Sequence, residues 1–445
     1  MDIEVAHPTP NPVEILQKLI QFDTTNPPGN ERECMLYIRD LLAEAGIEST
    51  LPARTPERPN LITRLKGAGQ APPLLLYGHV DVVTTANQDW KVLPFEGRIQ
   101  DGFVWGRGAL DMKGPVAMML TAVLKTRLEG AQLPGDVILA VVTDEEAGSE
   151  FGAKFLVGEH PYLFQGVRFA LGEFGGFNLK LMGKRFYPIM VAEKQICALK
   201  VTFRGAGGHG SMPMQGGAMS KLGKALVKLD HLRLPVHITP PVRLMIESLS
   251  RALPGATGIL LGQLTNPALT DFILGQLGER GDLISPMLHN TANPTMLAAS
   301  DKINVIPCEV YLGLDGRLVP GGTPEQMVSE LRDLLGEDFE VEVVAAEPGP
   351  ADTNLDGFEP LSSVLKELDP TGIPIPYVLS GVTDARFFSR LGIQTYGFTP
   401  LKLPDDFNFV STVHAVDERV PVEALDFGVQ AIYRALERLN ESLKH

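Results

Sequence analysis

Acidic side chains and a histidine follow two strongly apolar segments of this chain, at the positions where buried strands would end. Glu145 and Glu146 come directly after the apolar run 137–142. His79 and Asp81 follow a second such run in the same way. Adjacent carboxylates at the mouth of a buried strand are unfavourable unless positive charge lies beside them. Because imidazole and carboxylate ligands without thiolates suit zinc, with cobalt or manganese as alternatives, these residues indicate a metal centre, and the glutamate pair indicates a hydrolytic one.

Three further candidates lie at corresponding places in the chain. They are Glu173 after another apolar segment, His414 in a loop after the apolar run 393–398, and Asp111 after a glycine-rich turn. In an open parallel sheet, ligands bind at the carboxyl ends of the strands, so we expect these side chains to meet in one crevice. Taken alone, each has an ordinary explanation, such as a structural histidine, a solvated acid pair or, for Asp111, a helix N-cap. Their shared position favours the metal centre.

The candidate residues need a framework that brings strand ends together. Short, continuously apolar segments alternate with amphipathic ones in the first part of the chain and again near its end. This pattern predicts an α/β fold with a mainly parallel sheet and flanking helices. The predicted strands are 60–65, 73–77, 137–142, 168–171 and 393–398, and the predicted helices are 12–22, 32–45, 112–128, one beginning at 152, and 422–439.

The pattern changes near residue 193. Apolar and polar residues alternate over 199–203, which is typical of a strand with one solvated face. The glycine-rich stretch 205–210 is expected to be a turn, and 233–300 shows no clear periodicity. Further strands are predicted at 310–314 and 339–343, with helices at 219–229 and 327–335. We therefore expect a catalytic metal-binding domain formed by residues 1–193 and 348–445, interrupted by an inserted α+β domain at 194–347.

Charge and composition narrow the class of protein. The net charge of −15 argues against nucleic acid as a partner, because phosphate binding needs a basic surface. No apolar run approaches the 18 or so residues of a membrane-spanning helix, so no membrane association is expected. The three cysteines are widely separated and lack metal-binding spacing. Together with a start that has no signal-like apolar segment, they favour a cytoplasmic location.

From about residue 12 to its end, the chain resembles the zinc amidohydrolase family that contains aminoacylase, acetylornithine deacetylase, succinyl-diaminopimelate desuccinylase and carboxypeptidases G and S. The stretch 191–194 is similar to the carboxypeptidase S branch. The motifs that carry the resemblance are 78–81, Trp90 with 94–95, 106–114, 144–146, 207–209 with Pro213, 304–307, 315–317 with 320–321, 383–386 and 413–414.

The resemblance implies a site with two zinc ions per subunit, with cobalt or manganese as alternatives. One ion is expected to be held by His79, Asp111 and Glu173. The other is expected to be held by Asp111, Glu146 and His414, so that Asp111 bridges the two. Glu145 would be the general base that activates water, and Asp81 would orient the ring of His79.

The resemblance also assigns substrate contacts to the inserted domain, which would serve as a lid and dimerisation domain. Arg317 would bind a substrate carboxylate, His209 would stabilise the developing oxyanion, and Asn304 would help to hold the substrate. In dimeric members of the family the histidine comes from the partner subunit. We therefore expect a homodimer, in which His209 acts either within its own subunit or across the interface.

The predicted function is metal-dependent hydrolysis of amide bonds in N-acyl amino acids or small peptides. Two alternatives stay open: a catalytically silent relative that acts in binding or assembly, and a hydrolase of carbamoyl or other C–N bonds. The loop 404–409 has no counterpart in the family pattern, so the acyl group and the amino acid of the substrate are not predicted.

Overall fold

The computed structural model describes residues 10–347, 349–350 and 352–444, and it divides into two compact units. Unit 1 contains the chain up to Val191, together with 354–377 and the residues from Thr383 onward. Unit 2 contains 192–353 and the short segment 378–382. The lid and dimerisation roles expected for the inserted domain stay predictions.

Unit 1 is built on a nine-stranded sheet, which confirms the predicted α/β class. Its central neighbours β6, β3, β7 and β17 are parallel, whereas β2 and β9 pair in the antiparallel sense. In spatial order the strands are β1 (Ser49–Thr50), β2 (Leu61–Leu65), β6 (Val137–Val142), β3 (Leu74–His79), β7 (Phe169–Gly172), β17 (Gln394–Gly397), β9 (Lys184–Glu193) and β16 (Gly372–Leu379), with β8 (Leu179–Leu181) beside β9.

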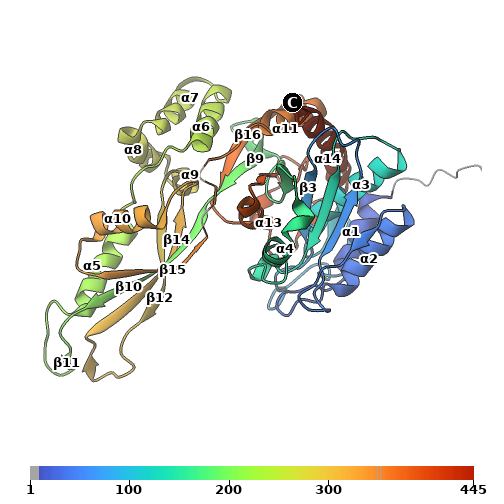
Figure 1. Ribbon diagram of the computed structural model, residues 1–445. Coiled ribbons are helices and arrows are strands. Elements are labelled where there is room, and N and C mark those ends of the chain that lie inside the picture. The colour runs from blue at the N-terminus through green and yellow to red at the C-terminus, as the bar shows by residue number, and fades with distance from the viewer. Residues whose placement is uncertain (1–9, 348, 351, 445) are drawn as a thin grey trace, which may run out of the picture. The chain divides into compact units, whose positions relative to one another are not determined.

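Helices cover both faces of this sheet, which explains why its central strands are apolar without interruption (Figure 1). Alternate residues of β3 and β6 pack against α1, α3 and α14 on one face and against α4 and α12 on the other. The helices are α1 (Pro12–Gln21), α2 (Arg32–Glu44), α3 (Lys113–Leu128), α4 (Ala153–Glu159), α11 (Phe358–Leu368), α12 (Ala385–Phe388), α13 (Phe409–Thr412) and α14 (Val422–Ser442), with short 3₁₀ turns at Glu145–Ala147, Pro161–Phe164 and Ser389–Leu391.

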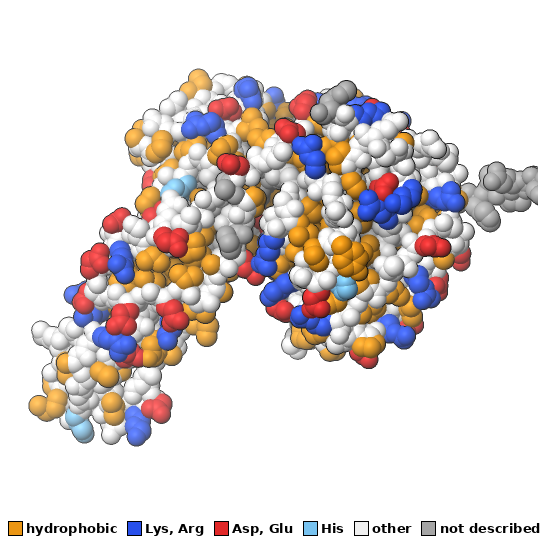
Figure 2. Space-filling model, in the orientation of Figure 1, with side chains coloured by type: hydrophobic (Ala, Val, Ile, Leu, Met, Phe, Trp, Pro, Cys, Tyr) orange, Lys and Arg blue, Asp and Glu red, His pale blue; other side chains and the backbone are white. Residues whose placement is uncertain are grey.

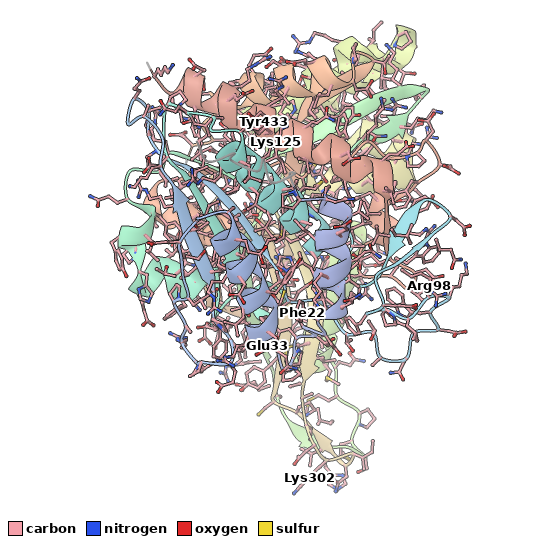
Figure 3. All side chains as sticks on the ribbon, turned by 90° about the vertical axis from the view of Figure 1, so that its right-hand side faces the viewer. Phe22, Glu33, Arg98, Lys125, Lys302 and Tyr433 are labelled. Carbon is pink, nitrogen blue, oxygen red and sulfur yellow. The ribbon has the colours of Figure 1, made fainter. Side chains whose placement is uncertain are left out.

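The long helices α3 and α14 lie against each other, and their contact continues to the surface. There Lys125 of α3 lies over the ring of Tyr433 of α14, 5.1 Å from its centroid (Figure 3). A small second sheet links the N-terminal half of unit 1 to the chain just before α14. It consists of β4 (Arg98–Gln100), β5 (Phe103–Trp105) and β18 (Arg419–Pro421).

Unit 2 contains an antiparallel four-stranded sheet in the order β12-β14-β10-β15. The alternation noted over 199–203 is real: Leu199, Val201 and Phe203 face a core shared with α5 and α10. Hydrophobic and charged side chains are interspersed on the visible surface of this unit (Figure 2). Its strands and covering helices are β10 (Gln195–Arg204), β12 (Thr291–Ala298), β14 (Glu309–Leu318), β15 (Glu340–Glu347), α5 (Ala218–His231) and α10 (Pro324–Leu335).

Two parts of unit 2 differ from the sequence expectation. The stretch 205–210 is not only a turn, because it includes β11 (Gly208–His209), which pairs with β13 (Val305–Ile306). The segment without clear periodicity is mostly helical, with α6 (Pro240–Ala252), α7 (Gly255–Gly262), a 3₁₀ turn at Gln263–Thr265, α8 (Pro267–Leu277) and α9 (Glu279–Leu288). Across the described residues of both units, the helices lack the combined length and apolar character that a membrane crossing needs.

Candidate metal centre

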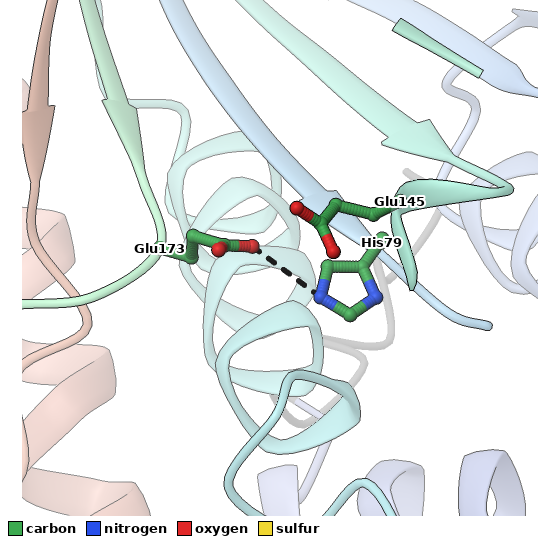
Figure 4. Close-up of side chains that lie close together, drawn as sticks. All are labelled: His79, Glu145 and Glu173. Atoms are coloured by element: carbon green, nitrogen blue, oxygen red, sulfur yellow. Dashed lines mark ion pairs between the residues drawn. The ribbon is translucent and has the colours of Figure 1, made fainter. Parts of the chain in front are cut away.

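The predicted ligands in unit 1 meet at the carboxyl ends of the parallel strands. His79 is the last residue of β3, and its Nε2 lies 3.0 Å from Asp111 Oδ1 and 3.3 Å from Glu173 Oε2. Figure 4 shows the carboxylates of Glu173 and Glu145 beside the ring of His79. These contacts bring together residues from the ends of three neighbouring strands, as the sequence pattern predicts.

A second histidine completes a matching arrangement on the other side of Asp111. His414 Nε2 lies 3.1 Å from Asp111 Oδ2 and 3.1 Å from Glu146 Oε1. The two oxygens of Asp111 therefore face two different imidazoles, and each imidazole also faces a glutamate. Two groups of three potential ligands, with one aspartate in common, are an arrangement that would suit two neighbouring cations.

Asp111 was open to a simpler explanation as a helix N-cap, and the structure rejects that explanation. The helix α3 begins at Lys113, Met112 is its N-cap residue, and no side chain caps it. The carboxylate of Asp111 is directed at the two histidines instead.

The hydrogen bonding of His79 fits a cation ligand. Its Nδ1 lies 3.0 Å from the backbone carbonyl oxygen of Asp81, so Nδ1 carries a hydrogen and donates it. In the neutral ring the lone pair of Nε2 then points at two carboxylate oxygens, an unfavourable contact unless a cation or a proton lies between them. Glu173 Oε2 is buried, and the described residues offer it no hydrogen-bond donor when His79 Nε2, 3.3 Å away, carries no proton. This oxygen and the lone pair of Nε2 suit a divalent cation.

The wider set of ligand atoms is also compact. The ligand atoms of His79, Glu145 and Glu173 lie within 4.8 Å of one another, and so do those of His79, Asp111 and Glu146. These groupings differ from the two ion-pair triads, because they assign His79 to both. We prefer the triads, since a histidine offers only one free ring nitrogen when Nδ1 is bonded to a carbonyl.

The close packing of these acids and histidines also shifts their pKa values. The carboxylates of Asp111 and Glu146 raise the pKa of His414 to about 10. Burial alone would lower the pKa of His79, but Asp111, Asp81 and Glu173 outweigh it and hold that pKa well above its usual value. Burial raises the pKa of Glu173 to about 7. Burial, and then repulsion from Glu173, also raises the pKa of Glu145 well above its usual value. Protons thus occupy the centre when no cation is bound.

Asp81 faces the second ring nitrogen of His79 in two ways. Its backbone carbonyl oxygen lies 3.0 Å from His79 Nδ1, and its carboxylate oxygen Oδ1 lies 3.5 Å from the same atom. The carboxylate accepts hydrogen bonds from the backbone N–H groups of Glu145 and Glu146, both at 3.1 Å, and from Asn26 Nδ2 at 2.9 Å. Asp81 therefore holds both the candidate base and one candidate ligand in place.

One buried acid near the centre was not among the predicted site residues. Asp384 Oδ1 accepts a hydrogen bond from Ser149 Oγ at 2.5 Å. Burial raises the pKa of Asp384 to about 6, and its charge contributes to the raised pKa values of Glu145 and Glu173. The signal for it was present, because it lies in the motif 383–386 that the resemblance includes.

The predicted substrate contacts lie in unit 2. His209 is exposed in β11, and its Nδ1 lies 2.8 Å from Ser211 Oγ. Asn304 is beside it in space, because its carbonyl accepts the N–H of Gly210 at 2.8 Å. Arg317 of β14 donates to both carboxylate oxygens of Asp315, at 2.7 and 3.2 Å. The roles of these residues toward a substrate stay predictions.

Comparisons with known proteins agree with the family resemblance seen in the sequence. The family model described as peptidase family M20/M25/M40 matches residues 75–438. The human N-fatty-acyl-amino acid synthase/hydrolase PM20D1 is 28% identical over 380 residues, which covers 82% of this chain and 74% of that protein. Pig aminoacylase-1 is 25% identical over 409 residues, which covers 89% of this chain and 88% of that protein. The fold is similar to an M20 family metallo-carboxypeptidase from Sulfolobus solfataricus, with a TM-score of 0.68 and 17% identity, covering 97% of this chain and 100% of that one.

Proposed function

The chain belongs to peptidase family M20/M25/M40, whose members hydrolyse amide bonds, and we propose that it is a two-metal hydrolase of N-acyl amino acids or short peptides. The observation that carries this proposal is that the two carboxylate oxygens of Asp111 face two different histidines, each of which also faces a glutamate. The names of the relatives support the substrate class, since both an aminoacylase and a fatty-acyl-amino acid hydrolase align with most of this chain.

The residues that would hold the cations follow from the two triads. His79, Asp111 and Glu173 would hold one ion, and Asp111, Glu146 and His414 the other. Zinc fits this nitrogen and oxygen ligand set best, with cobalt or manganese as alternatives. When bound, two such cations supply positive charge that polarises the scissile carbonyl and lowers the pKa of water.

Glu145 would carry the proton during the reaction. Its carboxylate accepts a proton from the attacking water and then delivers it to the nitrogen of the leaving amine, which closes the proton balance of hydrolysis. Asp81 keeps Glu145 in position through the backbone N–H contact. The carboxylate of Glu145 lies within 4.8 Å of the candidate ligand atoms of His79 and Glu173, which supports a role at the metal centre rather than as a solvated surface acid.

Unit 2 would supply recognition of the substrate. Arg317, held in orientation by Asp315, would bind the α-carboxylate, His209 would stabilise the oxyanion, and Asn304 would contact the substrate. We further propose that the enzyme is a homodimer. Its three cysteines are free thiols, which supports a reducing compartment such as the cytoplasm.

A substrate panel tests the proposal. It contains N-acetyl, N-succinyl and long-chain N-acyl amino acids and dipeptides, each also prepared with its α-carboxylate converted to an amide. Chelator-sensitive hydrolysis of one group, with preference for the free carboxylate, supports the function. If zinc-loaded protein hydrolyses none of these substrates, the proposed function is contradicted, and a carbamoyl hydrolase or a binding protein is favoured instead.

A further inference from the structure

A buried ion pair lies directly behind two of the candidate ligands. Arg107 Nη1 donates to Glu418 Oε2 at 2.7 Å, and the two side chains are only 1% and 0% exposed. Arg107 belongs to the motif 106–114, whereas Glu418 lies 311 positions later, just before β18. Burying two charges is costly, and hydrogen bonds from their remaining groups offset part of that cost. Arg107 Nε has no hydrogen-bond partner among the described residues, whereas Nη1, Nη2 and both oxygens of Glu418 have one or more. These partners show which backbone segments the pair holds.

Glu418 binds the backbone at Asp111. Its second oxygen, Oε1, accepts the N–H of Leu110 at 2.8 Å and the N–H of Asp111 at 3.2 Å. The carboxylate thus anchors the peptide groups that lead into the bridging ligand. None of these contacts involves the Asp111 side chain, so its two oxygens stay free to face the histidines.

Arg107 binds the backbone at His414. Its Nη2 donates to the carbonyl oxygen of His414 at 3.2 Å and to Gln88 Oε1 at 2.9 Å, and its Nη1 also donates to the carbonyl of Ala415 at 3.1 Å. Gln88 Nε2 donates to the same His414 carbonyl at 3.4 Å. His414 has a φ of +62°, a backbone conformation that a residue with a side chain adopts only when its surroundings hold it.

The other triad has different supports. His79 is the end of β3 and is held by the backbone of Asp81, and Glu173 follows β7. The Arg107 guanidinium forms its hydrogen bonds with Gln88, His414, Ala415 and Glu418, and none of these is a ligand of the first triad. A change at Arg107 should therefore disturb His414 far more than His79 or Glu173.

We propose that Arg107, paired with Glu418, is a positioning residue that fixes His414 relative to Asp111. The ion bound by Asp111, Glu146 and His414 then depends on it strongly, whereas the ion bound by His79, Asp111 and Glu173 depends on it only through the Asp111 backbone that Glu418 holds. The inference rests on the proposed two-metal centre. It gives Arg107 a role in the motif 106–114, of which only Asp111 was expected to take part in the metal centre.

The test uses the Arg107→Lys variant of the full chain. Lysine keeps a positive charge beside Glu418 but lacks the planar fork that reaches Glu418, Gln88 and the His414 carbonyl together. Stepwise zinc affinities are measured by competition with a chromophoric chelator, and bound ions are counted by mass spectrometry. We expect one ion to bind about 10–100-fold more weakly and the other to change by less than about threefold, as is usual when a group supporting a metal ligand is altered.

Background variants identify the affected ion. In a Glu173→Ala background, which weakens the first triad, Arg107→Lys should weaken the second ion by the same factor as before. In a His414→Ala background Arg107→Lys should have little further effect, because His414 is already absent and only the indirect hold on the Asp111 backbone remains. The matched control is Arg185→Lys, which alters a partly exposed arginine of the same unit that is paired with the buried Asp369 at 2.9 Å. It should leave both affinities unchanged.

Equal weakening of both ions, no weakening of either, or an undiminished loss in the His414→Ala background would overturn the inference. If Arg107→Lys does not fold, Gln88→Leu decides, since it removes contacts to the same guanidinium and carbonyl without touching the buried pair. It should weaken the same ion to a smaller extent, and unchanged affinities would overturn the inference. Failure of the wild-type protein to bind two ions would instead contradict the proposed function.

Discussion

The Asp81 carboxylate accepts the backbone N–H of Glu145 at 3.1 Å, which ties the candidate base to the segment that directly follows His79 at the end of β3. The other carboxylate oxygen accepts the N–H of Glu146 at the same distance. One buried side chain therefore sets the position of a proton-transfer group and of a metal ligand at once. Its influence on the reaction passes through the backbone rather than through direct contact with a substrate.

Replacing Asp81 with Asn should lower both zinc affinity and turnover. Asparagine retains one acceptor oxygen but turns an NH₂ group toward the other backbone N–H, so one of the two glutamates loses its anchor. We expect an affinity loss of about 10–100-fold, measured by competition with a chelator. Asp40→Asn on the surface of α2 is the control. Unchanged affinity and turnover in Asp81→Asn would refute this role.

Replacing Glu145 with Gln should separate metal binding from catalysis. Glutamine keeps the shape of the side chain but cannot accept and return the proton, so kcat should fall by about 10²–10⁴-fold. Both ions should remain bound, as counted by mass spectrometry. Glu150→Gln, which changes an exposed acid in the same region, should behave like the wild type. Near-normal kcat in Glu145→Gln would show that another group is the base.

Zinc binding should release protons at neutral pH. Without cations, His414 has a pKa of about 10 and the pKa of His79 is also well above its usual value, so both rings are protonated at pH 7. Because ligands must lose their protons, binding of two ions at pH 7 should release the two ring protons and about half a proton from Glu173, whose pKa is about 7, and fewer protons above pH 10. Calorimetry in buffers of different ionisation enthalpy measures this number. Heats that do not depend on the buffer would contradict the protonation of the empty centre.

Lys194 should make the free energy of unfolding depend on pH in the neutral to alkaline range. Burial, and then repulsion from Arg317, lowers the pKa of this 1%-exposed lysine from 10.5 to about 7. Its Nζ donates to the carbonyl of His289 and to Thr291 Oγ1, and a neutral amine has the two hydrogens that these bonds need. Between pH 7 and 10.5 the unfolded state binds more protons, so the free energy of unfolding should rise with pH by up to about 1.4 kcal/mol per pH unit.

Urea unfolding of wild-type and Lys194→Met protein across this range measures that slope. Methionine has no ionisable group, so the contribution of Lys194 should disappear from the difference between the two proteins. The exposed Lys224→Met variant should keep the wild-type slope. A parallel pH dependence in wild-type and Lys194→Met protein would contradict a lowered pKa.

The sequence was most informative where burial leaves a direct pattern. The strand 137–142 was predicted at its observed bounds, because its residues pack against helices on both faces and must all be apolar. The same reasoning placed His79, Glu146 and Glu173 at strand ends, where the structure brings them together. By contrast, β16 was missed because Pro374 and Pro376 interrupt it, which a strand at the edge of a sheet tolerates.

Contacts between distant segments left no such pattern. The helices α6 to α9 were not predicted, because three of them contain prolines and their apolar faces are short. The pairing of Arg107 with Glu418 joins positions 311 residues apart, and nothing in either local sequence specifies its partner. The shares of the Asp81 carbonyl and of its carboxylate in orienting His79 depend on atomic positions that residue types alone do not define.

The most direct test of the two-metal centre measures activity as a function of the number of zinc ions bound per chain. Protein stripped of metal by chelation is titrated with zinc in known equivalents while hydrolysis of the best substrate of the panel is followed. The account predicts negligible activity without zinc and a rise that reaches its maximum at two bound ions per chain. Full activity in the stripped protein, or a maximum at one bound ion with no second ion bound, would contradict a centre in which Asp111 bridges two cations.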